Sequence, residues 1–213
     1  MIKFNIQVLV DNTDSWYIPY AKKIVNELKR KHNVRLIHKH EDVEKGDVLF
    51  LISCNKKFNN LYLNNCNIVI HESDLPKGKG WSPLTWQVLE GQSEIFVTLF
   101  EASEEIDAGK IYYKNKIVLM GHELLSEIRH KQGIITNQLI RRFIKDYPNV
   151  EGVEQQGEET YYARRSQKDS ELDINKSLNE QFDLLRVCDN KKFPAFFIIN
   201  GIKYFLKITK DEK

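Results

Sequence analysis

A single histidine stands where an apolar run gives way to a loop rich in proline and glycine, in the stretch "NIVIHESDLPKGKGWSPLTW" from Asn67 to Trp86. His71 is expected at the carboxyl end of a buried strand, where open α/β sheets place ligands and catalytic groups. An imidazole is a suitable proton acceptor near neutral pH, although this position also fits a hydrogen-bonded structural histidine. The glycines and prolines indicate a tight, open loop that lets a ligand approach the backbone.

A second candidate is Asp107, in "EEIDAGKI" between two β-rich runs. On sequence alone an acid in such a loop is an ordinary turn former. The Walker and G-x-G-x-x-G patterns are absent, so nucleotide hydrolysis and a dinucleotide cofactor have no motif support. "HELLS" has Ser126 where a zinc helix needs a second histidine, so we expect no metal site.

Composition narrows the class of protein. The chain has 213 residues, 41% apolar and 29% charged, with a net charge of +2, which is typical of a globular protein and argues against one that grips a nucleic-acid backbone. Three widely spaced cysteines without a CxxC pair suggest a reducing compartment. No signal peptide or membrane-length apolar run is visible, so a cytoplasmic protein without membrane partners is expected.

The elements that must position these residues follow an α/β pattern. Apolar runs predict strands at 4–11, 47–54 and 67–71, and 3/4 spacing predicts a helix along 17–28. Two further β-rich runs flank Asp107, and a long amphipathic helix is expected from about 122 to 147. This order predicts an α/β fold with a mainly parallel sheet.

The end of the chain reads as an extension. The polar segment 151–159 is a candidate linker, which divides the chain into a core (1–152) and an extension (153–213). The extension is expected to hold a helix at about 174–187 and a β-hairpin that turns at Asn200-Gly201. A lone hairpin is marginal without cover, so one expectation from this pattern is a homodimer in which a second copy covers the hairpin.

Three segments, "HESDLPKGKGWSP", "VTLFEASEEIDAGKI" and "RRSQKDSELD", together resemble the folate-dependent formyltransferases. That family has a histidine in H-x-S-x-L-P ahead of a glycine-rich loop, and an aspartate in D-x-G-x-I some three dozen residues later. His71 and Asp107 keep this spacing, and the surrounding positions that fit are Ser73, Leu75, Pro76, Gly80, Gly109 and Ile111. The resemblance covers roughly 48–111 and implies a Rossmann-like catalytic core.

The late segments "RRSQKDSELDINKS" and "LLRVCDNKKFPAFF" resemble the sugar N-formyltransferases that act on nucleotide-linked 4-amino sugars, and most of all those of pseudaminic-acid-type pathways. Methionyl-tRNA formyltransferase is the alternative enzyme. It usually carries a further tRNA-contacting β-domain, which would begin about where this chain ends, and a basic surplus that this chain lacks. A non-catalytic module that binds folate or a nucleotide sugar is the third possibility.

The resemblance implies transfer of a formyl group from 10-formyltetrahydrofolate to the 4-amino group of a nucleotide-linked sugar of the UDP-4-amino-4,6-dideoxy-N-acetyl-altrosamine type. His71 would take or relay the amine proton, and Asp107 would orient the ring and support its charge. By the same analogy, the pterin would be flanked by Ser103, Glu104, Glu105 and Ile106. The amino sugar would contact Lys77, Lys79 and Trp81. The nucleotide would contact Asp11, Asn12, Arg164, Arg165, Asp189, Asn190 and Phe193.

One position departs from the family pattern. The family usually has N-x-H, with an asparagine two residues before the histidine, but Val69 stands there. Asn67 lies at an even step along the same strand, and Asn55 ends the neighbouring predicted strand. Either is a candidate for the missing oxyanion donor, and the sequence does not choose between them.

Overall fold

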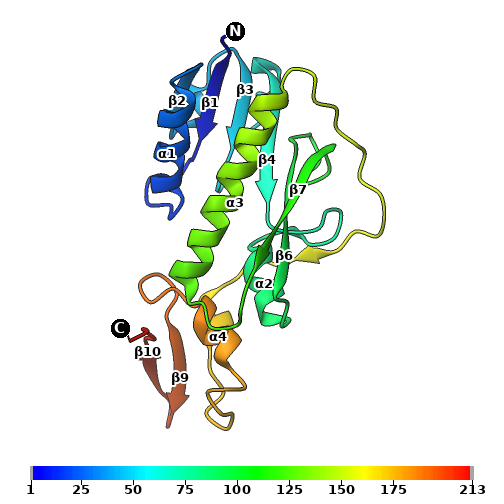
Figure 1. Ribbon diagram of the computed structural model, residues 1–213. Coiled ribbons are helices and arrows are strands. Elements are labelled where there is room, and N and C mark those ends of the chain that lie inside the picture. The colour runs from blue at the N-terminus through cyan, green and yellow to red at the C-terminus, as the bar shows by residue number, and fades with distance from the viewer. Residues whose placement is uncertain (1, 212–213) are drawn as a thin grey trace.

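A six-stranded mixed sheet forms the centre of the computed structural model, which describes residues 2–211 (Figure 1). Its strands lie in the order β2-β1-β3-β4-β6-β7, and those from β2 to β4 are parallel, whereas β6 runs antiparallel to both of its neighbours. The predicted α/β fold with a mainly parallel sheet is confirmed. The bounds are β1 Asn5–Leu9, β2 Asn33–Ile37, β3 Gly46–Leu51, β4 Asn64–His71, β6 Glu94–Glu101 and β7 Ile111–Val118.

Two helices cover one face of this sheet (Figure 1). They are α1 (Ile18–Leu28) and α3 (Leu125–Asp146). Helix α3 confirms the helix predicted at 122–147, with nearly the same bounds. Their apolar stripes join the sheet in one core, where Phe143 packs edge-on against Phe50. The buried Tyr17 hydroxyl donates to Asn137 Oδ1 at 2.7 Å and fixes the start of α1 against α3. The opposite face is covered by loops that include the short 3-10 helices η1 (His40–Asp42) and η2 (Leu61–Leu63).

Smaller elements follow at the end of the sheet near the site. Helix α2 (Pro83–Leu89) begins with proline and ends just before Gly91, the two places in a helix where these residues are most favourable. The two-residue strands β5 (Lys79–Gly80) and β8 (Tyr161–Tyr162) pair in parallel. Among residues 2–211, no helix is long and apolar enough to cross a bilayer.

The C-terminal part contains η3 (Gln167–Ser170), α4 (Phe182–Val187) and the hairpin of β9 (Ala195–Ile199) and β10 (Ile202–Leu206). The hairpin prediction is confirmed, because Asn200 and Gly201 both adopt positive φ, the conformation of a two-residue primed turn.

The helix predicted at 174–187 is wrong in its first half, since α4 begins only at Phe182. The side chain of Gln181 accepts from the Asp173 N–H and donates to the Asp173 carbonyl, and Ser177 and Glu180 bond to each other. These side-chain bonds replace helical ones in the backbone of 173–181.

The candidate linker lies against the core in this fold. Val153 forms an isolated antiparallel bridge with Ile111 at the start of β7, and the chain then returns across the sheet edge to β8 (Figure 1). The division at 152/153 stays a prediction. The segment 153–162 contributes contacts to the site described next.

Candidate active site

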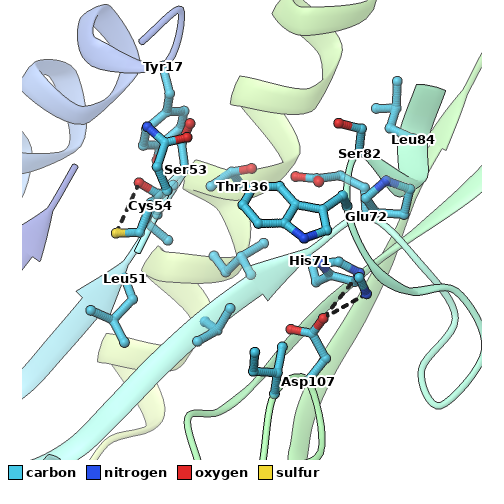
Figure 2. Close-up of a pocket in the computed structure, with 18 of the residues that line it drawn as sticks. Tyr17, Leu51, Ser53, Cys54, His71, Glu72, Ser82, Leu84, Asp107 and Thr136 are labelled. Atoms are coloured by element: carbon cyan, nitrogen blue, oxygen red, sulfur yellow. Dashed lines mark hydrogen bonds and ion pairs between the residues drawn. The ribbon is translucent and has the colours of Figure 1, made fainter. Parts of the chain in front are cut away.

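A cavity of about 440 Å³ opens at the carboxyl ends of β3 and β4 (Figure 2). Its walls come from residues 16–17 before α1, 51–58 from the end of β3 onward, 69–72 at the end of β4, 80–85 between β5 and the first turn of α2, the loop 102–107 except Glu104, and one face of α3. This is the edge where open α/β sheets bind ligands, and the volume lies in the usual range of small-molecule sites.

His71 ends β4 and is buried in the cavity wall, with 8% of its surface exposed. Its Nε2 lies 2.9 Å from the carbonyl oxygen of Gly78. A carbonyl oxygen only accepts, so Nε2 carries the hydrogen and donates it. The other ring nitrogen, Nδ1, has no hydrogen-bond partner among residues 2–211 and holds the lone pair of the neutral ring. His71 is therefore held in one tautomer and able to accept a proton at Nδ1.

Asp107 lies beside this histidine, although the two come from separate motifs (Figure 2). Its Oδ2 is 3.8 Å from His71 Nε2, too far for a hydrogen bond but close enough for strong attraction once the ring is charged. The same oxygen accepts the Gly80 N–H at 3.0 Å. Gln155 donates to the backbone carbonyls of Asp107 and Gly109, both at 2.9 Å, and so braces the loop from outside.

The glycine of the D-x-G motif is required by space. A Cβ on Gly109 would lie 1.8 Å from the carbonyl oxygen of Glu101 on β6. Gly80 has a positive φ, and its Cβ would lie 2.5 Å from the Tyr162 carbonyl. Each glycine lets a loop of the site approach another backbone closely, which holds Asp107 and its Gly80 partner in place.

Sequence reasoning missed Glu72, the residue that follows His71. Its side chain is partly buried and lines the cavity, as does Thr136 of α3 (Figure 2). Gln132 of α3 donates to Glu72 Oε1 at 2.7 Å. Burial raises the pKa of the Glu72 carboxyl, although the nearby His71 ring opposes that rise. Its place directly after the candidate histidine was the only available signal.

Of the residues assigned to the pterin by analogy, Ser103, Glu105 and Ile106 line the cavity. Glu104 does not, and its carbonyl accepts a hydrogen bond from Lys57 Nζ instead. An apolar part of the cavity wall is formed by Leu51, Phe58, Val69, Phe100 and Ala102. An apolar wall with polar groups at its rim fits a flat heteroaromatic ligand.

Of the three loop residues assigned to the sugar, one lines the cavity and two do not. Trp81 lines the cavity, and the Arg164 guanidinium lies 4.6 Å from the centre of its ring. Lys77 is exposed outside the cavity. Lys79 is buried, and its ammonium lies 2.5 Å from a Glu159 carboxylate oxygen. The substrate contacts of the two lysines stay predictions, although Lys79 already has a partner.

The residues assigned to the nucleotide lie outside the cavity wall. Two of them shape a turn beside it: Asp11 accepts the N–H groups of Asn55 and Lys56, and Asn12 accepts that of Asp14. The others have different surroundings. Arg165 donates to the Asp169 carbonyl, and Asp189 pairs with the cavity-lining Arg129 at 2.9 Å. Asn190 bonds to the Ile208 backbone, and Phe193 is exposed. Their nucleotide contacts stay predictions.

The position of the family's usual asparagine is apolar here, because Val69 lines the cavity between β3 and β6. Asn67 donates to the Leu61 carbonyl at 2.7 Å and is outside the cavity wall. Asn55 is exposed and lines the cavity. Of the two candidate donors, Asn55 alone reaches the site.

Comparison with known proteins gives matches in sequence and in fold. Residues 54–144 match the family model described as formyl transferase. A methionyl-tRNA formyltransferase from Clostridium thermocellum has a similar structure, with a TM-score of 0.81 and 23% identity over 98% of this chain and 93% of that one. A 4-N formyltransferase from Francisella tularensis has a TM-score of 0.74 and 19% identity over 99% of both chains. HypX from Aquifex aeolicus, solved with tetrahydrofolic acid, has a TM-score of 0.79 and 18% identity over 97% of this chain and 38% of its own.

Proposed function

We propose, from the match of residues 54–144 to the formyl transferases, that this protein is an N-formyltransferase acting on the 4-amino group of a nucleotide-linked amino sugar. The formyl donor of the family is 10-formyltetrahydrofolate. The observation that carries the proposal is the meeting of His71 and Asp107 at one cavity. A sugar of the UDP-4-amino-4,6-dideoxy-N-acetyl-altrosamine type is the substrate we propose.

The cavity fits the donor. Its apolar wall accepts a pterin ring, and Ser103 and Glu105 offer polar groups at the rim. When bound, 10-formyltetrahydrofolate supplies a carbon at the formyl oxidation level that a neutral amine can attack. The residues of the chain must then place the amine, remove its protons and keep bulk water away.

His71 is the base in this proposal. Its Nδ1 lone pair takes the proton that the amine nitrogen loses as the new N–C bond forms, and the ring becomes a cation. His71 then gives this proton to the nitrogen from which the formyl carbon departs, so that nitrogen leaves neutral and the histidine is regenerated. The Gly78 carbonyl and the Asp107 carboxylate face the Nε2–H and stabilise that cation. Because Asp107 is itself fixed by the Gly80 N–H, the stabilising charge is in place before the proton moves.

A sugar acceptor is favoured over methionyl-tRNA by two observations. The net charge is only +2, with no surplus for a polyanionic partner. The fold itself is compatible with either acceptor, because proteins described as a 4-N formyltransferase, a sugar N-formyltransferase and a methionyl-tRNA formyltransferase all match it. Trp81, with Arg164 stacked on it, offers a flat surface and a fixed cation at the cavity mouth.

The test is an assay of the purified protein with 10-formyltetrahydrofolate and a panel of nucleotide-linked amino sugars. Formylated sugar is detected by mass spectrometry. We expect His71→Asn and Asp107→Asn to lower kcat by about 10²–10⁴-fold, the range of general acid–base catalysis, with folding checked by thermal denaturation. Equal turnover by all three proteins would end the proposal. Formylation of charged tRNA alone would replace the substrate, and binding without turnover of any amine would favour a non-catalytic module.

A further inference from the structure

Glu72 is a cavity-lining carboxylate that the catalytic pair does not use. It follows His71 at the end of β4, beyond the last residue that pairs with β6. Gln132 fixes its Oε1 at 2.7 Å, and Gln87 donates to its backbone carbonyl at 2.6 Å. Both anchors are neutral amides. They hold the carboxylate in one place without compensating its charge.

No cation of residues 2–211 pairs with Glu72. The guanidinium that lines the same cavity belongs to Arg129, and it is committed to Asp189 at 2.9 Å and lies over the Trp16 ring. A partly buried carboxylate without a cation is costly, and burial accordingly raises the pKa of Glu72. The cavity thus contains a fixed carboxyl group that is paired with no lysine or arginine of residues 2–211 and whose nearest opposing charge is the His71 ring.

We infer that Glu72 binds the ammonium form of the substrate's amino group in the cavity and accepts the first of the two protons that this nitrogen must lose. The inference rests on the proposed function and names the residue that recognises the acceptor amine. In this role, Glu72 makes the cavity bind a sugar with an amine at the reacting position more tightly than one with a hydroxyl there.

The proton balance requires two acceptors. A primary alkyl amine is protonated near neutral pH, as lysine is, and an ammonium has no lone pair with which to attack. One N–H bond of the ammonium breaks, its electron pair stays on nitrogen, and the proton forms an O–H bond on Glu72. The neutral amine then attacks, and its second proton goes to His71 as described above. Glu72 returns its proton to water, so the turnover releases one proton in all.

Glu72 also has an alternative, purely structural role, because its bond to Gln132 joins the end of β4 to α3. The variant Glu72→Gln separates the two roles. A glutamine at this position keeps the shape and still accepts the Gln132 hydrogen bond, but it has no negative charge. Glu41→Gln is the matched control, since Glu41 is exposed and lies outside the cavity wall.

The experiment is calorimetric binding, without folate, of UDP-4-amino-4,6-dideoxy-N-acetyl-altrosamine and of its 4-hydroxy counterpart. We expect the wild type and Glu41→Gln to prefer the amine, and Glu72→Gln to bind it about 10- to 100-fold more weakly with little change for the hydroxyl sugar. In the formyl-transfer assay, Glu72→Gln should raise KM for the amine and lower kcat, and Glu72→Asp should recover part of the loss.

An unchanged preference for the amine in Glu72→Gln would overturn the inference, even if the wild type is an active sugar formyltransferase. If the wild type binds neither sugar, the proposed substrate is wrong, and methylammonium becomes the probe. Methylammonium shifts seen by NMR at the cavity of the wild type but not of Glu72→Gln would retain the ammonium site. Their absence from the wild type would overturn it.

Discussion

The substitution Gly109→Ala tests whether the loop that carries Asp107 must touch β6. The added Cβ would lie 1.8 Å from the Glu101 carbonyl oxygen, whereas Cβ atoms in proteins essentially never come within 3.0 Å of a neighbour. The loop or the strand must therefore move by more than about 1 Å. A shift of about 1 Å in a catalytic group typically costs about 10²-fold in rate, and overpacking costs about 1–3 kcal/mol of stability. We expect both losses in Gly109→Ala.

The matched control is Gly91→Ala, just past the end of α2. Its φ of +79° disfavours alanine, but nothing lies within 4 Å of the added Cβ. The backbone conformation costs about 1–2 kcal/mol, so this control also loses stability while keeping the kcat of the wild type. Urea unfolding and formyl-transfer kinetics on both variants give the comparison. A Gly109→Ala protein with the wild-type kcat would show that Asp107 needs no such placement, and the reasoning would fail.

Two further predictions concern a buried carboxylate outside the cavity and an asparagine that lines it. Burial alone would raise the pKa of Glu123, but hydrogen bonds from Lys131 Nζ and the Met120 N–H lower it to about 2. Glu123→Gln should therefore lose about 2–4 kcal/mol of unfolding free energy at pH 7, as measured by urea unfolding. The difference in unfolding free energy between wild type and variant should be complete above pH 4.5 and should shrink as the pH falls toward 2. A difference that does not change with pH would refute this prediction. Asn55→Ala should lower kcat about 10²-fold with little change in KM, the expected loss of an oxyanion donor, and an unchanged kcat would place that donor elsewhere.

Much of the fold was predictable because its signals are local. The apolar run that ends at His71 and the stripe of α3 identify a central strand and a covering helix, and Asn200-Gly201 identifies a hairpin. The resemblance to formyltransferases was also predictable from short motifs, and the match of residues 54–144 confirms it. The start of α4 was not predictable, because side chains such as Gln181 form hydrogen bonds to the backbone where a helix would have backbone–backbone bonds.

The site was predictable only in part. The approach of His71 and Asp107 follows from two motifs at one sheet edge. Glu72 was not predictable from the strand pattern, because neighbouring residues of a strand normally face opposite sides of the sheet. Glu72 lies beyond the last residue of β4 that pairs with β6, and there both His71 and Glu72 line the cavity. The ion pair between Lys79 and Glu159 was not predictable, because the two residues are 80 positions apart and nothing near Lys79 in the sequence reveals its partner.

The geometry of the His71–Asp107 pair depends on a segment of the chain that lies outside both motifs. The formyl transferase match ends at residue 144, yet Gln155 holds the carbonyls on either side of the Asp107 turn, and Glu159 holds Lys79. Strand β8 pairs with Lys79–Gly80, and the Gly80 N–H is the donor that fixes the Asp107 carboxylate. The position of this donor therefore depends on β8. Residues 153–162 therefore act as the outer brace of the site. A motif alone places an imidazole and a carboxylate in the same region, but this brace is what holds them 3.8 Å apart.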